Sequence, residues 1–188
     1  MNSLKDRKEK LHELIAEAHN ADYAQQCEEF VLNDSRPVAE AAQAVLQNTP
    51  RAFGICVVMS AHLCAILTDS YKLPAVVVAG DLVISGIPAF QTDVKIQQPE
   101  LTEIIIDDWQ GHSWVEIGGL IVDISLGRTA DLAPDGSNLK AFVHKQFGNG
   151  KGLLAFPVEH AYSLDMIYAP REVLADNIIT AIIQSHHS

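Results

Sequence analysis

A histidine and an aspartate lie close together in residues 112–125, a segment that reads as two strands joined by a turn. Gly118 and Gly119 suit a two-residue hairpin turn, because glycine adopts positive φ without steric cost. This turn places Asp123 opposite Trp114. Since side chains alternate between the two faces of a strand, His112 and Asp123 become diagonal neighbours on one face. A carboxylate that orients an imidazole forms half of a nucleophilic catalytic apparatus.

Cys56 is the candidate nucleophile that could complete this apparatus. It follows Phe53-Gly54-Ile55 at the start of a predicted helix, where free N–H groups and the helix dipole favour a thiolate. Its backbone N–H could also donate to the oxyanion of a tetrahedral intermediate. Cys27 and Cys64, the other two cysteines, are expected to be inert core residues.

The residues around His112 supply candidates for the remaining roles. Trp109 and Gln110 precede the histidine strand and are candidates for the second oxyanion donor. Trp114 and Glu116 are expected mainly to cover the sheet, although Trp114 is also a candidate for contact with substrate. A zinc site built on Cys56 is disfavoured, because the spacing of nearby ligands differs from that of structural zinc sites. We therefore expect no metal and no organic cofactor.

Helices are expected at both ends of the chain, and the nucleophile is expected at the start of one of them. The predicted helices cover 3–32, 37–47, 56–71, 138–147 and a last segment that opens at Ala169-Pro170 and ends near Gln184. Residues 126–137 hold two glycines and a proline, so we expect them to be irregular.

Strands are expected between the helical segments. They cover 75–79, 82–87, 101–106, the hairpin, 153–157 and 164–168. Helices first, strands next and a helix last predict an α+β fold with a mainly antiparallel sheet. We expect a single domain over 1–188, with an N-terminal helical segment (1–50) and a catalytic core with the C-terminal helix (51–188).

Four short motifs occur in an order that resembles the transglutaminase-like group of the papain-type cysteine protease superfamily. They are Gly54-Ile55-Cys56, Tyr71-Lys72-Leu73-Pro74-Ala75-Val76-Val77-Val78-Ala79-Gly80, His112-Ser113-Trp114-Val115-Glu116-Ile117 and Val122-Asp123. The resemblance covers about residues 54–125. It implies a papain-like or transglutaminase-like core in which Cys56 is the nucleophile, His112 the base and Asp123 the orienting acid. Val76 stands where the group usually has arginine, and Ile124-Ser125 replaces its common Pro-Thr, so the substrate pocket is expected to differ.

The composition limits the partners and the compartment. The formal net charge is −11, which disfavours binding to nucleic acid or to an anionic membrane. No apolar run is long enough for a transmembrane helix, and the charged N-terminus does not resemble a signal peptide. Three cysteines cannot all pair, which favours a reducing cytoplasm, while a secreted effector remains an alternative.

These observations predict a cysteine-dependent acyl-transfer enzyme that acts on amide bonds of a protein or peptide. Peptidase, amidase, deamidase and transglutaminase activities share the thioester intermediate and differ in the acceptor. Two alternatives stay open. One is a non-catalytic binding or scaffold member of the same fold. The other is an acyl transferase of the arylamine N-acetyltransferase type, because Val122-Asp123-Ile124-Ser125-Leu126-Gly127 is faintly similar to a motif of that family. The sequence leaves the oligomeric state open.

Overall fold

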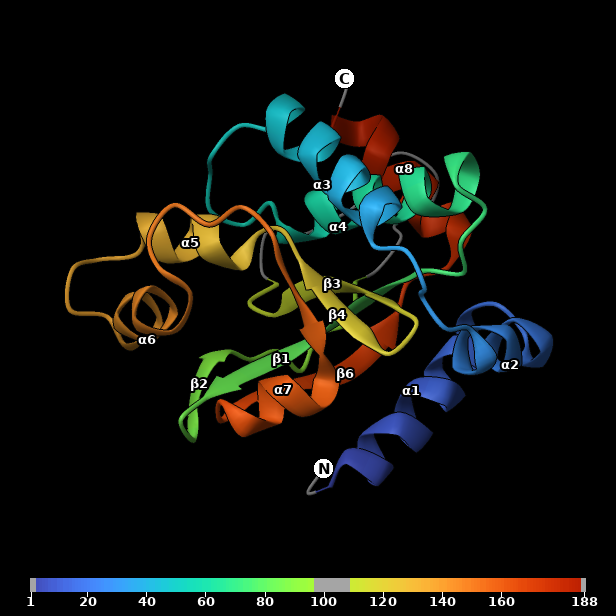
Figure 1. Cartoon of the computed structure of the whole chain (residues 1–188), viewed down its shortest axis with the longest axis horizontal. Coiled ribbons are helices and arrows are strands. Elements are labelled where there is room, and N and C mark those ends of the chain that lie inside the picture. Colours follow the sequence, from blue (N-terminus) through green and yellow to red (C-terminus); the bar gives the residue numbers. More distant parts are fainter. Residues whose placement is uncertain (1–2, 97–108, 187–188) are drawn as a thin grey trace.

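A mainly antiparallel sheet lies between two layers of helices in the computed structural model, which describes residues 3–96 and 109–186. Figure 1 shows α3, α4 and α8 on one side of the sheet and α1 and α7 on the other. The fold class is therefore α+β, as the order of elements predicted. The helices are α1 (Leu4–Ala18), α2 (Ala21–Glu29), α3 (Arg36–Asn48), α4 (Cys56–Ala65), α5 (Leu126–Leu132), α6 (Asn138–Phe147), α7 (Val158–Ser163) and α8 (Asp176–His186), with a π-helical turn at Ile66–Ser70 after α4.

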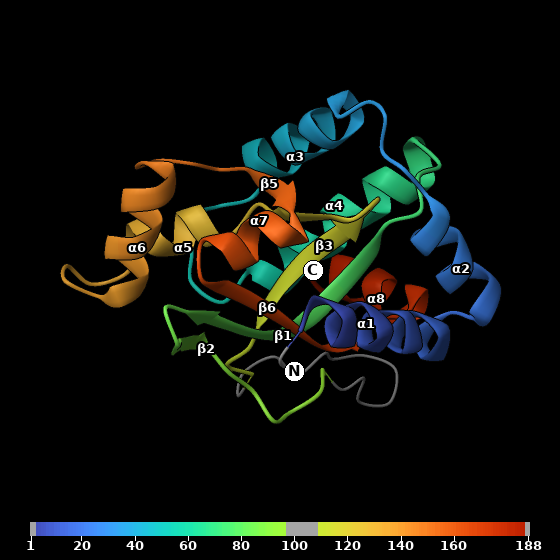
Figure 2. The ribbon, with the colours of Figure 1, turned by 60° about the horizontal axis from the view of Figure 1, so that its bottom comes forward.

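The six described strands form one sheet in which every pairing is antiparallel. They are β1 (Val76–Ile84), β2 (Ile87–Phe90), β3 (His112–Ile117), β4 (Leu120–Asp123), β5 (Leu154–Pro157) and β6 (Met166–Val173). The order is β2-β1-β3-β4-β5, and β6 pairs with β1. Because Val78 pairs with both Trp114 and Val173, β3 and β6 lie on opposite edges of β1. Figure 2 shows α1 running alongside β6, with which it is in contact.

The hairpin has the predicted register. Glu116 pairs with Ile121 and Ile117 pairs with Leu120, and both turn glycines have positive φ (54° and 78°). Alternation sends Val115 and Ile117 into the core beneath α3, α4 and α8. The opposite face is buried as well, because α1 and α7 cover it, and every residue of β3 is buried.

Several predicted elements differ in extent. The predicted helix 3–32 is two helices, because Asn20 accepts a hydrogen bond from the Tyr23 backbone N–H (2.8 Å) and starts a new one. The predicted strands 75–79 and 82–87 form the single long strand β1 and the start of β2. The predicted strand 101–106 lies outside the described residues.

Two predictions about the second half of the chain are wrong. Residues 126–132, expected to be irregular, form α5. The last helix, expected to open at Ala169-Pro170, begins at Asp176 instead. Pro170 lies in β6. Pro170 pairs with Gly80 at a bulge between Ala79 and Gly80. A proline is tolerated there because a bulge interrupts the regular ladder of hydrogen bonds.

Candidate active site

Cys56, His112 and Asp123 come together as the sequence predicts. Cys56 is the first residue of α4, His112 is the first of β3, and Asp123 is the last of β4. Gly54 supports the entry into α4, because its φ of 77° is a conformation that glycine adopts without strain. All three side chains are buried, and Cys56 retains 8% of its exposure.

The imidazole of His112 bridges the other two residues. Its Nε2 lies 2.5 Å from Asp123 Oδ2, and the Cys56 side chain lies close enough to the ring to raise the pKa of His112. Because Asp123 occupies Nε2, the nitrogen that remains for the sulfur is Nδ1. The three candidate side chains therefore form one continuous chain of contacts, with the imidazole in the middle.

Electrostatics in this buried cluster favour the ion pair. Burial lowers the pKa of His112, but the charge and hydrogen bond of Asp123, together with the Cys56 sulfur, outweigh burial and raise it to about 10. For Asp123 the effects have the opposite signs. Burial raises the pKa of this carboxyl, but the interactions with His112 and with the backbone N–H groups of Leu126 and Ser125 outweigh burial and lower the pKa below its usual range. An ionised Asp123 next to a protonated His112 is the charge state that these shifts favour.

The second oxygen of Asp123 is held by the turn that follows β4. Oδ1 accepts hydrogen bonds from the backbone N–H groups of Ser125 (3.0 Å) and Leu126 (2.9 Å) and from the Ser125 hydroxyl (3.1 Å). These donors fix the rotation of the carboxylate, so Oδ2 points at His112.

Aromatic rings surround the imidazole and keep water away from it. Phe90, at the end of β2, stacks on His112 with ring centroids 4.8 Å apart. Tyr168 of β6 is fully buried, and its hydroxyl donates to Asp123 Oδ2 (3.1 Å). Neither residue was singled out from the sequence. They lie in separate strands, and only the pairing of β2 and β6 with β1 brings them to the site.

Trp114 has a packing role in this structure. It is fully buried, and its indole N–H donates to Glu116 Oε1 (2.8 Å). Glu116 is paired with Arg7 of α1, which also donates to the Tyr168 carbonyl (2.7 Å). The candidate contact between Trp114 and substrate is therefore not supported, because no part of its ring reaches solvent.

The other two candidates lie beside the histidine strand. Gln110 is exposed, and Trp109 is half-buried against the hydrophobic cluster that contains Cys56. A Cβ on Gly111 would come within 2.5 Å of the Trp109 ring, so only glycine lets the indole lie this close to the strand. Trp109 also lines a cavity of about 210 Å³ with Thr92 and Arg171.

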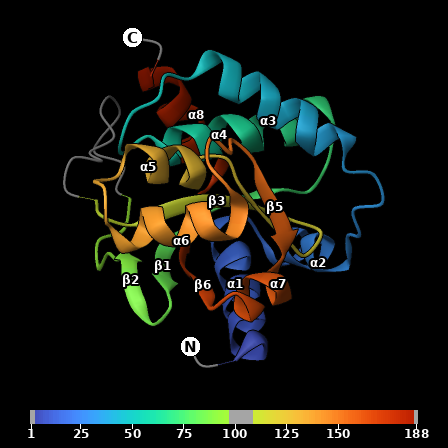
Figure 3. The same ribbon diagram turned by 60° about the vertical axis from the view of Figure 1, so that its left-hand side comes forward.

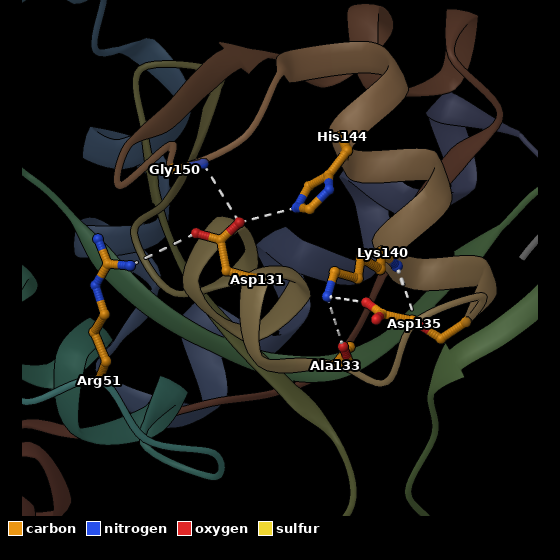
Figure 4. A network of polar contacts seen from close by, with 8 residues as sticks. Arg51, Asp131, Ala133, Asp135, Lys140, His144 and Gly150 are labelled. Carbon is orange, nitrogen blue, oxygen red and sulfur yellow. Dashed lines mark hydrogen bonds and ion pairs between the residues drawn. The ribbon is translucent and has the colours of Figure 1, made fainter.

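Helix α5 holds the segment that leads to Cys56. Arg128 donates to the carbonyls of Leu46 (2.5 Å) and Thr49 (2.9 Å) at the end of α3. Asp131 lies between Arg51 (3.8 Å), the His144 ring (2.9 Å) and the Gly150 N–H (3.3 Å), as Figure 4 shows. Figure 3 shows α5 and α6 side by side.

The position of α5 links two parts of the site. It begins three residues after Asp123 and contacts the segment that precedes Cys56. Asp123 and the segment before Cys56 are therefore both connected to the same short helix. Because the sequence predicted no helix here, this support was missed.

The two remaining cysteines are in surroundings that disfavour thiolates. Burial raises the pKa of Cys27 to about 11, and burial also raises the pKa of Cys64, far more strongly. The Cys64 thiol donates to the Ala75 carbonyl (3.3 Å). Of the three cysteines, Cys56 is the one that lies beside an imidazole paired with a carboxylate.

Within residues 3–96 and 109–186, no group of three or more His, Cys, Asp or Glu side chains is arranged to hold a metal ion. Across the same residues, no helix has the length and apolar character needed to cross a membrane. Comparison of the chain with protein-family models, with curated proteins and with solved structures gave no match.

Proposed function

We propose that the protein is a cysteine-dependent acyl-transfer enzyme that acts on amide bonds of a protein or peptide. The observation that carries this proposal is the buried chain of contacts from Cys56 through His112 to Asp123. It brings together residues that are up to 67 positions apart in the sequence. Their order matches that of a nucleophile, a base and an orienting acid. Peptidase, amidase, deamidase and transglutaminase activities all use this chemistry.

The reaction follows from the charges of the site. The Cys56 thiolate attacks the amide carbonyl carbon, and the backbone N–H of Cys56 donates to the oxyanion. His112 then gives its Nδ1 proton to the leaving nitrogen, so that the C–N bond breaks and a thioester forms. Water or an amine adds to the thioester, His112 accepts the proton of that nucleophile, and the C–S bond breaks. Asp123 stays ionised throughout and holds the Nε2 proton.

The contact between Cys56 and His112 also favours an enzyme over a scaffold protein of the same fold. A binding module has no need of a thiol beside an imidazole that is itself paired with a buried carboxylate. Such a group is costly to bury without a function. For an acyl transferase of the arylamine type, the chain offers no motif for the nucleotide of an acyl-CoA donor.

The test uses p-nitrophenyl acetate, which acylates reactive thiols and releases a coloured product. We expect a burst of about one p-nitrophenolate per chain, with the acetyl group found on Cys56 by peptide mass spectrometry. Cys56→Ser should lose the burst, and His112→Gln should reduce it strongly. Cys27→Ser is the matched control that should leave it unchanged. Acetylation of Cys27 or Cys64 without Cys56, or an undiminished burst in His112→Gln, would contradict the proposal.

Amide specificity needs a second measurement. Peptides released from a proteome digest can be incubated with the wild type and with Cys56→Ser, with hydroxylamine present as an acceptor. Amide cleavage or exchange should give peptide hydroxamates only with the wild type. If the acetyl-enzyme forms but no peptide is converted, the triad is active and the assignment to amide substrates is wrong.

A further inference from the structure

Asp123 Oδ2 accepts two hydrogen bonds in a fully buried site. His112 Nε2 lies 2.5 Å from it, and the Tyr168 hydroxyl lies 3.1 Å from it. Tyr168 is on β6, the strand farthest along the chain from Cys56, and both rings are inaccessible to solvent. Two donors therefore compete for the negative charge of one oxygen.

The phenol is not needed to orient the carboxylate. Three donors from Ser125 and Leu126 already fix Oδ1, and rotation of Asp123 would break all of them. The hydroxyl of Tyr168 instead withdraws charge from the oxygen that faces His112. A carboxylate oxygen that accepts a second hydrogen bond is a weaker base toward the first donor.

We propose that Tyr168 is a positioning residue that weakens the hold of Asp123 on His112, so that the imidazole can release its positive charge and act as a base on the acyl-enzyme. This inference rests on the proposed function. It adds to that function a residue with opposite effects on two steps of the reaction, the formation of the thiolate and the hydrolysis of the thioester.

The charged and titratable groups that face this cluster come from five elements. Cys56 of α4 and Asp123 of β4 contact His112 directly. Tyr168 of β6 contacts Asp123, and Arg7 of α1 lies close enough to lower the pKa of Tyr168 against the larger effects of burial and Asp123, which raise it. Arg7 is neutralised by Glu116 of β3. The charge on Asp123 Oδ2 therefore depends chiefly on His112 and Tyr168.

Formation of the thiolate and hydrolysis of the thioester need opposite states of His112. A protonated His112 stabilises the Cys56 thiolate, so a stronger hold by Asp123 favours the first step. Hydrolysis needs the neutral ring. Water adds to the thioester carbonyl, Nδ1 takes one proton from that water, and the C–S bond breaks to release the acid and the Cys56 thiolate. Tyr168 favours this second step.

Tyr168→Phe tests the proposal by removing only the hydroxyl. The ring can keep its edge contact with Trp114, whose ring centroid lies 5.0 Å from that of Tyr168. The first readout is the rate at which iodoacetamide alkylates Cys56 as a function of pH. The second is the rate of acetyl-enzyme hydrolysis after a pulse of p-nitrophenyl acetate. Each rate rises with pH over a range that we call its limb. In Tyr168→Phe we expect the limb of the alkylation rate to move to lower pH by about half to one unit, and the limb of the hydrolysis rate to move to higher pH by a similar amount.

Opposite shifts separate a charge effect from loosened packing. A merely structural loss would move the alkylation limb up and lower both rates on their plateaus. Tyr162→Phe is the matched control, because that hydroxyl has no hydrogen-bond partner among the described residues, and it should leave both limbs in place. Unshifted limbs in Tyr168→Phe, or two limbs that move in the same direction, would overturn the inference.

Incorporation of 3-fluorotyrosine gives a second test that leaves every side chain in place, should Tyr168→Phe not fold. The more acidic phenol is a stronger donor, so both limbs should move in the directions opposite to those in Tyr168→Phe. Unchanged limbs would overturn the inference. If the wild type is not alkylated at Cys56, the proposed function itself fails. If the wild type reacts and only the Tyr168 shifts are missing, this inference alone fails.

Discussion

The buried ion pair between Arg7 and Glu116 gives a test of what the N-terminal helix does. Arg7 lies on α1 and is 2% exposed, while Glu116 is 6% exposed. The guanidinium donates twice to the carboxylate and once to the Tyr168 carbonyl. Glu116 also accepts from the Trp114 indole. One side chain of α1 thus joins the histidine strand to β6.

Replacement of Arg7 with methionine keeps much of the volume and leaves Glu116 ionised without its charged partner. Loss of one member of a buried pair costs about 3–5 kcal/mol. For a domain of this length, that corresponds to a fall in Tm of about 6–20 °C. The double variant Arg7→Met/Glu116→Gln should recover about 2 kcal/mol or more, because the neutral amide can still accept from Trp114 and carries no buried charge.

Urea denaturation followed by circular dichroism gives the free energy of unfolding of each variant. Lys5→Met is the matched control on the same helix. Its partner Glu9 lies 3.6 Å away, but the two side chains are 82% and 64% exposed, so the change should stay within about 0.5 kcal/mol. The reasoning is refuted if Arg7→Met lowers the free energy of unfolding no more than Lys5→Met does, or if the double variant is no more stable than Arg7→Met. In either case α1 is not held through this pair.

Three further changes test other parts of the site. Asp123→Asn removes the charge beside His112, so alkylation of Cys56 at pH 7 should slow about tenfold or more; an unchanged rate would show that the carboxylate charge is not used. The stability that His112 gains from its raised pKa is fully present below its unfolded value of 6.5 and lost as the pH rises through about 10. The difference in unfolding free energy between the wild type and His112→Gln should therefore shrink over that range, and a constant difference would contradict the linkage. Gly127→Ala places a Cβ 2.0 Å from the Lys151 carbonyl oxygen, so Tm should fall by an amount equivalent to about 1–3 kcal/mol despite the better helix propensity of alanine; a raised Tm would show that Lys151 can move away.

The hairpin and its chemistry follow from local rules. Gly118-Gly119 can adopt the positive φ values of a tight turn, and the turn sets the register of the two strands. The register in turn puts His112 and Asp123 on one face, where they are hydrogen-bonded. Cys56 could be singled out because a glycine, a helix start and a thiol are adjacent in the sequence. Each of these signals spans only a few residues.

Elements that depend on distant contacts were misjudged. Residues 126–132 look irregular in composition, yet they form α5, where Gly127 packs against the Lys151 backbone and Arg128 binds the end of α3. Pro170 looks like the first residue of a helix, yet it lies in β6, next to a bulge in the pairing of β6 with β1. In both cases tertiary packing outweighs the local preference.

By itself, the sequence determined the fold class and the hairpin register and pointed to Cys56, His112 and Asp123 as candidate site residues, because these depend on periodicity and on turn geometry over short distances. Only the tertiary structure decided that the face carrying His112 is closed off by α1, that Arg7 pairs with Glu116, and that Tyr168 shares Oδ2 of Asp123. The two pairs are 109 and 45 positions apart in the sequence. Burial and hydrogen bonding over such separations arise from the packing of the whole chain, which no local pattern encodes.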